Sequence, residues 1–237
     1  MVLKRLSPQE ARTRLEELTQ RATTTEPNLA QKLAALSKWI EPKKDGLLVS
    51  KPYVLDLLTE VIGDSEIWFG LRSLSDSERQ QFYASENFSV TEQYWLEVLF
   101  PRWISDPDPK FPNWRREVMN GNFRREDARL LKSLGRELTR KGGSYLWRHL
   151  LDLSMATDLL ASGQRESSLC VQLTTISEPH LDQKRQAWEM TLQFWCIERG
   201  LLISYNPMEN DLVDRLAATI FDHSNSLAMV EYFMILV

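Results

Sequence analysis

The first hundred residues carry apolar positions at the helical spacing, preceded by polar residues of the kind that cap helices. Ser7 stands three residues before Glu10, with a proline at the first helical position between them, which is the pattern of a capping box. A second apolar series covers residues 29–40 and ends before a proline. A third helix is predicted to start near Pro52 and to stop at Gly63. Further serine–glutamate pairs predict helix starts at Ser75 and Ser89.

The middle of the chain contains one more amphipathic segment. A helix is predicted from about Arg124 to Lys141, where two consecutive glycines end it. The aromatic segment around Tyr145 and Trp147 is predicted to be helical as well. These two segments lead into a part of the chain with a different periodicity.

The last eighty residues combine strand and helix periods. Residues 169–176 form an apolar strand pattern, residues 182–199 a helix with Gly200 as its C-terminal cap, and residues 201–205 a second strand. Strand, helix and strand joined by short loops predict a right-handed crossover with parallel strands. Around this unit we expect a short strand at 155–161, a helix at 209–222 and a buried apolar end at 229–237.

Proline interrupts the helical pattern at residues 105–113, which contain three prolines. Because proline lacks a backbone N–H and clashes with the preceding turn, this stretch cannot continue a helix, and we predict a linker there. The predicted organisation is a helical domain at 1–104, the linker at 105–113 and a second domain at 114–237. The fold class is therefore α+β or α/β, with a helical N-terminal domain followed by a small α/β core.

Composition narrows the class of protein. The chain has 237 residues, of which 43% are hydrophobic and 26% charged, as in ordinary globular proteins. Two cysteines, Cys170 and Cys196, provide neither a disulfide framework nor a zinc ribbon. The sequence shows neither a signal peptide nor an apolar stretch of membrane-spanning length, so we expect a cytoplasmic protein with no membrane partner.

Charge is distributed unevenly along the chain. The net charge of −4 by itself gives no sign of a nucleic-acid partner. Residues 110–148, however, hold eleven basic and four acidic residues, a net charge of +7 that leaves −11 for the remainder. Five of these cations are spaced by four, three, four and four residues, which places them within an arc of about 80° on one helix face. They are Arg125, Arg129, Lys132, Arg136 and Arg140.

A row of cations on one helix face has two interpretations. It suits the repeating phosphates of nucleic acid, giving a salt-dependent grip without sequence choice. It is also the ordinary solvated face of an amphipathic helix. We favour phosphate binding, because the cations are concentrated in an otherwise acidic chain.

Two polar residues share one face of the predicted strand at 169–176. Side chains alternate along a strand, so Gln172 and Thr174 point the same way, opposite to Leu173. Such a pair indicates either a site in a cleft or an edge strand whose polar face meets solvent.

Over about residues 124–206, the chain resembles the PD-(D/E)XK restriction-endonuclease-like nucleases, in the order of Asp158, Gln172, Lys184 and the strand at 201–205. In that superfamily an Asp on one strand and a Glu or Gln two residues before a Lys on the next strand hold a divalent metal. Asp158 and Gln172 match the first two positions, and Thr174 stands where the Lys is expected. Some members carry the lysine on the following helix, where this chain has Lys184.

The resemblance implies a restriction-endonuclease-like core, with Asp158 and Gln172 as metal ligands and Lys184 stabilising phosphate charge. The metal would be Mg²⁺, which needs hard oxygen ligands of which one or two are anionic. Glu137 would complete the metal site, as a Glu on the first core helix does in some members. Alternatively, Glu137 pairs with Arg140 or Lys141 in solvent, which we favour.

Apolar residues surround most of the helix at 182–199. Trp188, Leu192 and Trp195 form one stripe, and a second stripe includes Met190 and Phe194. This pattern predicts a helix buried between a sheet and another layer, in preference to a base-stacking surface.

Three functions remain open. In the first, the chain binds DNA or RNA and its nuclease-like domain hydrolyses it with Mg²⁺. In the second, the same fold has lost catalysis and serves as a nucleic-acid-binding or assembly subunit. In the third, the helical half is a protein-interaction module and the basic face docks a protein. A protein partner or a homodimer is compatible with all three.

Overall fold

The computed structural model describes residues 4–121, 128–164, 167–176, 178–227 and 231–237. Its backbone contacts divide the chain into two compact units. Unit 1 comprises Met1–Glu86 and Phe100–Arg124, and unit 2 comprises Asn87–Leu99 and Arg125–Val237. Residues 105–113, the predicted linker, lie within unit 1 in this division, and the domain boundary predicted there stays a prediction.

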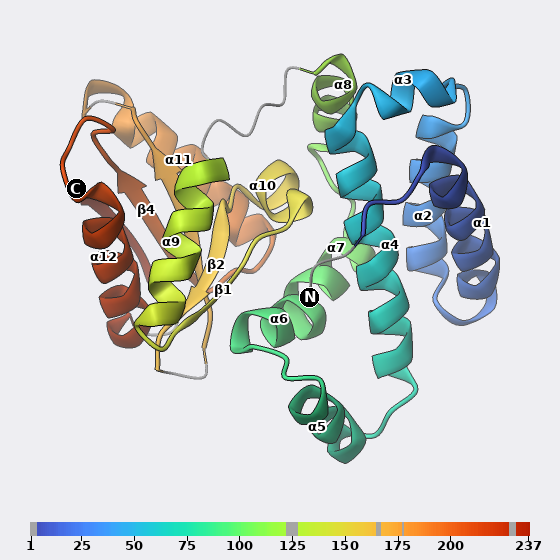
Figure 1. Cartoon of the computed structure of the whole chain (residues 1–237), viewed down its shortest axis with the longest axis horizontal. Helices are drawn as coiled ribbons and strands as arrows, with labels where there is room; N and C mark the ends of the chain where they lie inside the picture. Colours follow the sequence, from blue (N-terminus) through green and yellow to red (C-terminus); the bar gives the residue numbers. More distant parts are fainter. Residues whose placement is uncertain (1–3, 122–127, 165–166, 177, 228–230) are drawn as a thin grey trace. The chain divides into compact units, whose positions relative to one another are not determined.

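Unit 1 is built from helices alone in its described part (Figure 1). The capping boxes at Ser7 and Ser75 form as predicted, each with its serine side chain accepting a backbone N–H three residues on. The helices are α1 (Pro8–Thr25), α2 (Pro27–Ile40), α3 (Asp45–Val49), α4 (Pro52–Arg72), α5 (Asp76–Ser85), α7 (Phe100–Ser105) and α8 (Phe111–Asn120).

The predicted stop of the third helix at Gly63 is wrong, because α4 continues through this buried glycine. Its apolar series goes on to Trp68 and Leu71, and burial of these side chains outweighs the cost of about 1 kcal/mol that glycine imposes on a helix. Trp39 of α2 meets Trp114 of α8 edge to face, with 5.9 Å between the ring centroids. This contact holds α8, which follows the proline-rich stretch, within unit 1.

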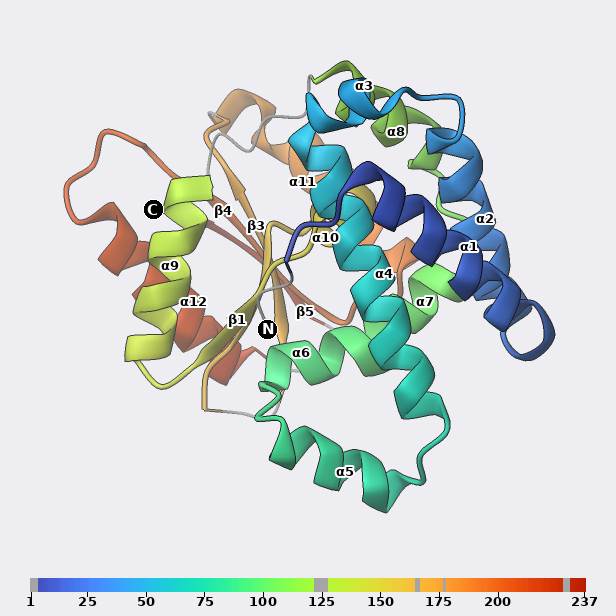
Figure 2. The ribbon, with the colours of Figure 1, turned by 45° about the vertical axis from the view of Figure 1, so that its right-hand side comes forward.

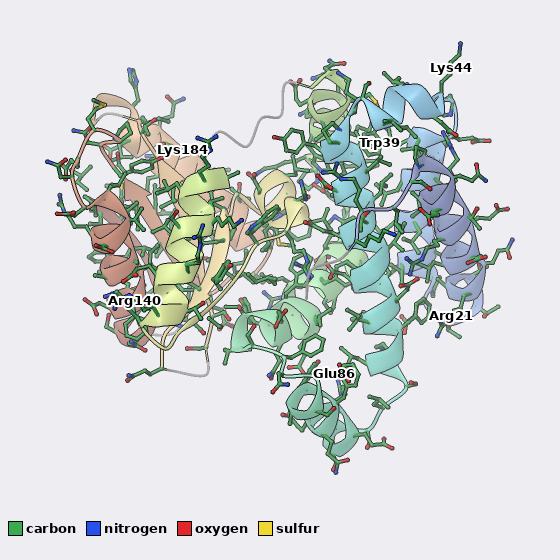
Figure 3. All side chains as sticks on the ribbon, in the orientation of Figure 1. Arg21, Trp39, Lys44, Glu86, Arg140 and Lys184 are labelled. Carbon is green, nitrogen blue, oxygen red and sulfur yellow. The ribbon has the colours of Figure 1, made fainter. Side chains whose placement is uncertain are left out.

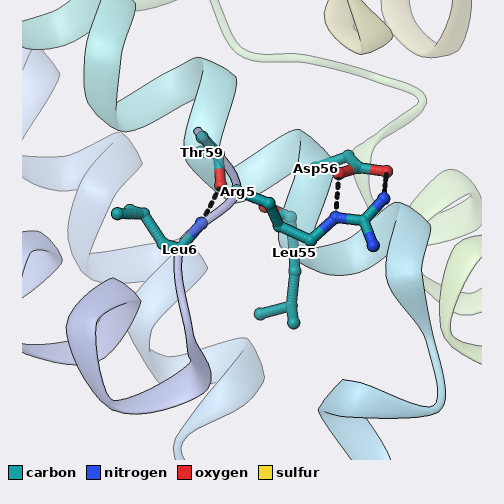
Figure 4. Close-up of polar contacts among 5 residues, drawn as sticks. All are labelled: Arg5, Leu6, Leu55, Asp56 and Thr59. Carbon is teal, nitrogen blue, oxygen red and sulfur yellow. Dashed lines mark hydrogen bonds and ion pairs between the residues drawn. The ribbon is translucent and has the colours of Figure 1, made fainter. Parts of the chain in front are cut away.

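The segment before α1 is fixed to α4 by polar contacts (Figure 4). Arg5 forms a two-point ion pair with the carboxylate of Asp56, including a bond of 2.7 Å from Nη2 to Oδ2. The backbone N–H of Leu6 donates to Thr59 Oγ1 at 3.0 Å, while that hydroxyl donates to the carbonyl of Leu55. The start of α1 is thereby positioned against the first half of α4.

Unit 2 contains a five-stranded mixed sheet with strand order β1-β2-β3-β4-β5. The first two strand pairs are antiparallel and the last two are parallel, so the predicted parallel pairing across the crossover is confirmed. The elements are α6 (Val90–Tyr94), a π-helix (Trp95–Leu99), α9 (Ala128–Arg140), β1 (Ser144–Leu146), α10 (His149–Met155), β2 (Leu159–Ser162), β3 (Leu169–Thr174), α11 (Glu178–Phe194), β4 (Arg199–Ser204), α12 (Leu212–Ser226) and β5 (Glu231–Leu236).

Helices cover both faces of this sheet. On one face α9 and α12 lie side by side, and their leucines share a core with Val171 of β3 and Ile203 of β4 (Figure 2). On the other face α11 packs through Trp188, whose ring lies against Gly200 and 5.9 Å from the ring of Tyr232. Side chains of β3 therefore alternate between two helical layers.

Several sequence-based predictions in this half need correction. The segment around Tyr145 is strand β1, not helix, because it pairs with β2. Gly200 lies inside β4 and does not cap the preceding helix, which ends at Phe194. The left-handed turn after that helix is made by Cys196, at φ 50°. Gly200 is needed because a side chain there would overlap Trp188 and Leu192.

Two apolar surfaces predicted to be buried are partly exposed. Met190 on α11 is 70% exposed and Phe194 is 45% exposed, so only the stripe of Trp188, Leu192 and Trp195 packs on the sheet. The apolar end of the chain forms β5 at the edge of the sheet. A periodic pattern identifies apolar positions, but it does not say how many neighbours are present to cover them.

Candidate functional site

The exposed face of α9 is the first candidate site. Leu131, Leu134 and Leu138 are buried and anchor the helix on the sheet. The cations occupy the opposite face as predicted, because residues three and four apart share a helix face. Four of them are described and exposed, namely Arg129, Lys132, Arg136 and Arg140, whereas Arg125 lies outside the described residues.

Most of this positive charge is not neutralised by the described residues of the chain. Arg140 donates from Nε to Glu137 Oε2 at 2.8 Å (Figure 3 labels Arg140). This hydrogen bond lowers the pKa of Glu137 and raises that of Arg140. Arg129, Lys132 and Arg136 form no ion pair with any other residue that the structure describes. These three cations therefore face solvent along one helix. Together with Arg140 they form a row about 16 Å long.

The polar pair on β2 and β3 is the second candidate site. Asp158 comes directly before β2, and its backbone N–H donates to the carbonyl of Val171 at 2.8 Å. The Asp158 carboxylate accepts two hydrogen bonds through Oδ2, from Gln172 Nε2 at 2.7 Å and from the backbone N–H of Leu173 at 2.6 Å. The structure thus brings together Asp158 and Gln172, which is only 8% exposed.

Thr174 stands where the resemblance expects a lysine. Its side chain bonds to the backbone at the end of β3. Its hydroxyl accepts the N–H of Ile176 at 3.3 Å. Ser204, which pairs with Thr174 in β4, donates from its hydroxyl to the carbonyl of Ile176 at 2.8 Å. These bonds fix the turn that leads towards α11, and they supply no positive charge.

Lys184 belongs to α11 (Figure 3 labels it). It follows buried Leu181 by three residues and precedes buried Trp188 by four, so it shares their helix face and is half-buried itself. Gln172 points to the same side of the sheet, because it alternates with Val171 and Leu173 of the opposite core. No hydrogen bond or ion pair joins Lys184 to another described residue.

The donor set of the second site differs from what Mg²⁺ needs. Asp158 supplies one carboxylate, and Gln172 turns its amide nitrogen towards that carboxylate. Glu137, the predicted third ligand, is held by Arg140, as the alternative interpretation of this residue had it. The described residues contain no group of three or more His, Cys, Asp or Glu side chains that could hold a metal ion. As placed, Asp158, Gln172 and Glu137 do not fit Mg²⁺, which needs more anionic oxygen ligands. The binding of Mg²⁺ by this chain stays a prediction.

Sequence analysis missed one charged residue that organises this unit. Arg199, at the start of β4, is only 5% exposed. Its guanidinium donates to the carbonyl of Ser224 at 2.7 Å and to the hydroxyl and carbonyl of Ser167 at 2.6 and 3.1 Å. A single arginine before an apolar strand carries no periodic signal, so only the fold shows that it joins the β2–β3 connection to the end of α12.

Comparisons with family models, with curated proteins and with solved structures found no match to this chain. The site must therefore be interpreted from its own residues. Among the described residues, none of the helices combines the length and the apolar character that crossing a membrane requires.

Proposed function

We propose that unit 2 binds the phosphate backbone of nucleic acids through the exposed face of α9. The observation that carries this proposal is the row of Arg129, Lys132 and Arg136, exposed and without an ion-pair partner among the described residues. Leucines on the opposite face hold the helix on the sheet, so the row is presented by a packed element.

Charge repulsion within the row favours a polyanionic ligand. Three like charges on one helix face, three and four residues apart, destabilise the helix slightly when no counter-charge is near. A bound phosphate backbone relieves that repulsion and releases its condensed counterions, which makes binding strongly dependent on salt. The row is short and regular, and this suits backbone contacts made without reading a base sequence.

The test is a binding titration on a labelled DNA duplex and on labelled single-stranded DNA and RNA, each over a series of salt concentrations. The triple variant R129E/K132E/R136E is expected to lose affinity by about tenfold or more. The plot of log K against log salt on the duplex is expected to become shallower, its negative slope decreasing in magnitude by about 2.7. Each lost phosphate contact contributes about 0.9.

A matched control reverses three exposed lysines of unit 1. The variant K4E/K38E/K44E has the same change in net charge but leaves α9 intact. It is expected to retain the salt slope of the wild-type protein. Equal losses of affinity in both triple variants would show that binding depends on net charge and not on the face of α9, against the proposal. Wild-type affinity in the α9 variant would also refute it.

Hydrolysis of nucleic acid with Mg²⁺ remains a separate prediction. It rests on the resemblance to the restriction-endonuclease-like nucleases, since Gln172 directs its amide nitrogen, and no oxygen, towards the Asp158 carboxylate. Cleavage of DNA or RNA that requires Mg²⁺ or Mn²⁺ and disappears in Asp158→Ala would support it. Binding without cleavage would instead favour a nucleic-acid-binding or assembly subunit.

A further inference from the structure

Strand β5 forms one edge of the unit 2 sheet, and its composition is unusual for an edge strand. The sheet ends at β5 in the described part of the chain, and β5 pairs only with β4. Natural edge strands are usually protected by lysine, proline or a bulge. From Glu231 to Leu236 there is one charge, at the first position, followed by Tyr, Phe, Met, Ile and Leu.

The hydrogen bonds of β5 show which of its residues face outwards. The N–H groups of Glu231 and Val237 donate to the carbonyls of Glu198 and Ser204, so odd-numbered residues bond towards β4. Backbone groups alternate sides along a strand in a parallel pair. The N–H and C=O groups of the even-numbered residues therefore point to the open edge. These residues are Tyr232, Met234 and Leu236.

We propose that β5 pairs with β5 of a second copy of this chain, antiparallel and centred on Met234. This register sets Met234 opposite Met234 of the second copy and Tyr232 opposite Leu236. Every outward-facing residue of both strands is then in a hydrogen-bonded pair. A centre one residue earlier leaves Leu236 without a pairing residue in the opposite strand, and a centre one residue later leaves Tyr232 without one. The edge is therefore most complementary to itself in the Met234 register.

The side chains favour the same pairing. Phe233 is 43% exposed and Leu236 is 54% exposed, although both belong to a strand of the sheet. In the proposed register Phe233 lies opposite Ile235 of the second copy, and Leu236 opposite Tyr232. Cross-strand pairs of aromatic and branched side chains stabilise antiparallel strands. The single charge of each strand, Glu231, falls at the end of the paired segment.

The pairing has a consequence for α9. Phe233 contacts His223 of α12, with 5.2 Å between the rings, and Ile235 packs against the core beneath α9 and α12. Residues opposite each other on antiparallel strands point to the same face of a sheet. The α9 helices of both copies therefore lie on one face of a continuous sheet, which would present two rows of cations to one ligand.

The first test measures the mass of the full chain in solution by light scattering over a range of concentrations. The wild-type protein is expected to be a dimer of about twice 27.6 kDa. Met234→Pro is expected to be a monomer, because it removes an outward N–H and leaves the bonds to β4 in place. Met208→Lys and Met190→Lys, at exposed positions outside β5, are expected to remain dimers.

The second test fixes the register by oxidation in a Cys196→Ser background. A hydrogen-bonded antiparallel pair has Cα atoms about 5.5 Å apart, which suits a disulfide. Met234→Cys should therefore form a disulfide-linked dimer. Leu236→Cys should not, because its two copies are four positions apart, about 13 Å along the strand.

Each of the following results would overturn the proposal. They are a monomeric wild-type protein at all concentrations, a dimer that persists in a folded Met234→Pro variant, and cross-linking of Leu236→Cys as efficient as that of Met234→Cys. Dissociation by Met190→Lys would assign the dimer to α11 and would overturn it too.

Discussion

Gly135 of α9 lies directly against the ring of Tyr145 in β1, so close that a Cβ atom at position 135 would overlap the ring. The contact joins the basic helix to the first strand of the sheet. It also explains why a glycine stands inside a helix that otherwise consists largely of good helix formers and presents its cations along one face.

Gly135→Ala is expected to destabilise the protein. Alanine normally stabilises a helix interior by about 1 kcal/mol relative to glycine, but here the added methyl group must displace Tyr145. The net loss in the free energy of unfolding is expected to be up to about 2 kcal/mol. Urea denaturation measures it. Gly70→Ala in α4 is the control, because nothing lies within 4 Å of its added methyl group, and it should be neutral or stabilising.

Asp158→Ala is expected to destabilise unit 2 whether or not a metal binds. The substitution removes Asp158 Oδ2, which accepts hydrogen bonds from Gln172 Nε2 and from the Leu173 N–H. Both donors then lose this partner at a largely buried position. The expected cost is about 1–3 kcal/mol in the free energy of unfolding. Asp222→Ala, on the exposed side of α12, should change stability by less than about 0.5 kcal/mol. Equal stabilities of the two variants would contradict this account.

Arg199→Met is expected to weaken the joint between the β2–β3 connection and α12. Methionine fills most of the volume but donates no hydrogen bond to Ser167 or Ser224. The expected loss is about 3 kcal/mol, as for other buried charged groups that lose their partners. Chemical denaturation gives this value, with Arg215→Met as the control. Arg215 forms an exposed ion pair with Glu209, whose loss should cost at most about 1 kcal/mol.

Lys32 in unit 1 should make stability depend on alkaline pH. Burial lowers the pKa of Lys32, although Asp108 and Asp106 act in the opposite direction. The unfolded chain therefore binds this proton more tightly than the folded chain. As pH rises from the lowered pKa towards the ordinary value of 10.5, this residue's contribution makes the protein more stable.

The check is the difference in unfolding free energy between the wild-type protein and Lys32→Met, measured at several alkaline pH values. The wild-type protein should gain stability relative to the variant as pH rises through this window. Only the slope is diagnostic, because Lys32 also donates to the carbonyl of Asp106 at 2.6 Å. Parallel curves would show that Lys32 keeps its ordinary pKa.

Local chemistry was sufficient to predict much of the helical half. The capping boxes at Ser7, Ser75 and Ser89 form because each depends on residues three positions apart, which any helix brings together. The two faces of α9 follow from the spacing of its leucines and cations for the same reason. The alternation that put Gln172 on one face of its strand, opposite Leu173, is equally local.

The remaining features depend on contacts between residues distant in the chain. Tyr145 is in a strand because β2 lies beside it, and position 200 holds a glycine because Trp188 and Leu192 of α11 occupy the space above it. The sequence by itself determined most helices of the first hundred residues and which face of α9 carries charge, since these properties depend on neighbours three and four residues away. Only the tertiary structure decided that Asp158 meets Gln172, that Arg199 is enclosed and that β5 ends the sheet with an open edge. Burial and strand pairing depend on which distant segments are available to cover a residue, and no periodic pattern contains that information.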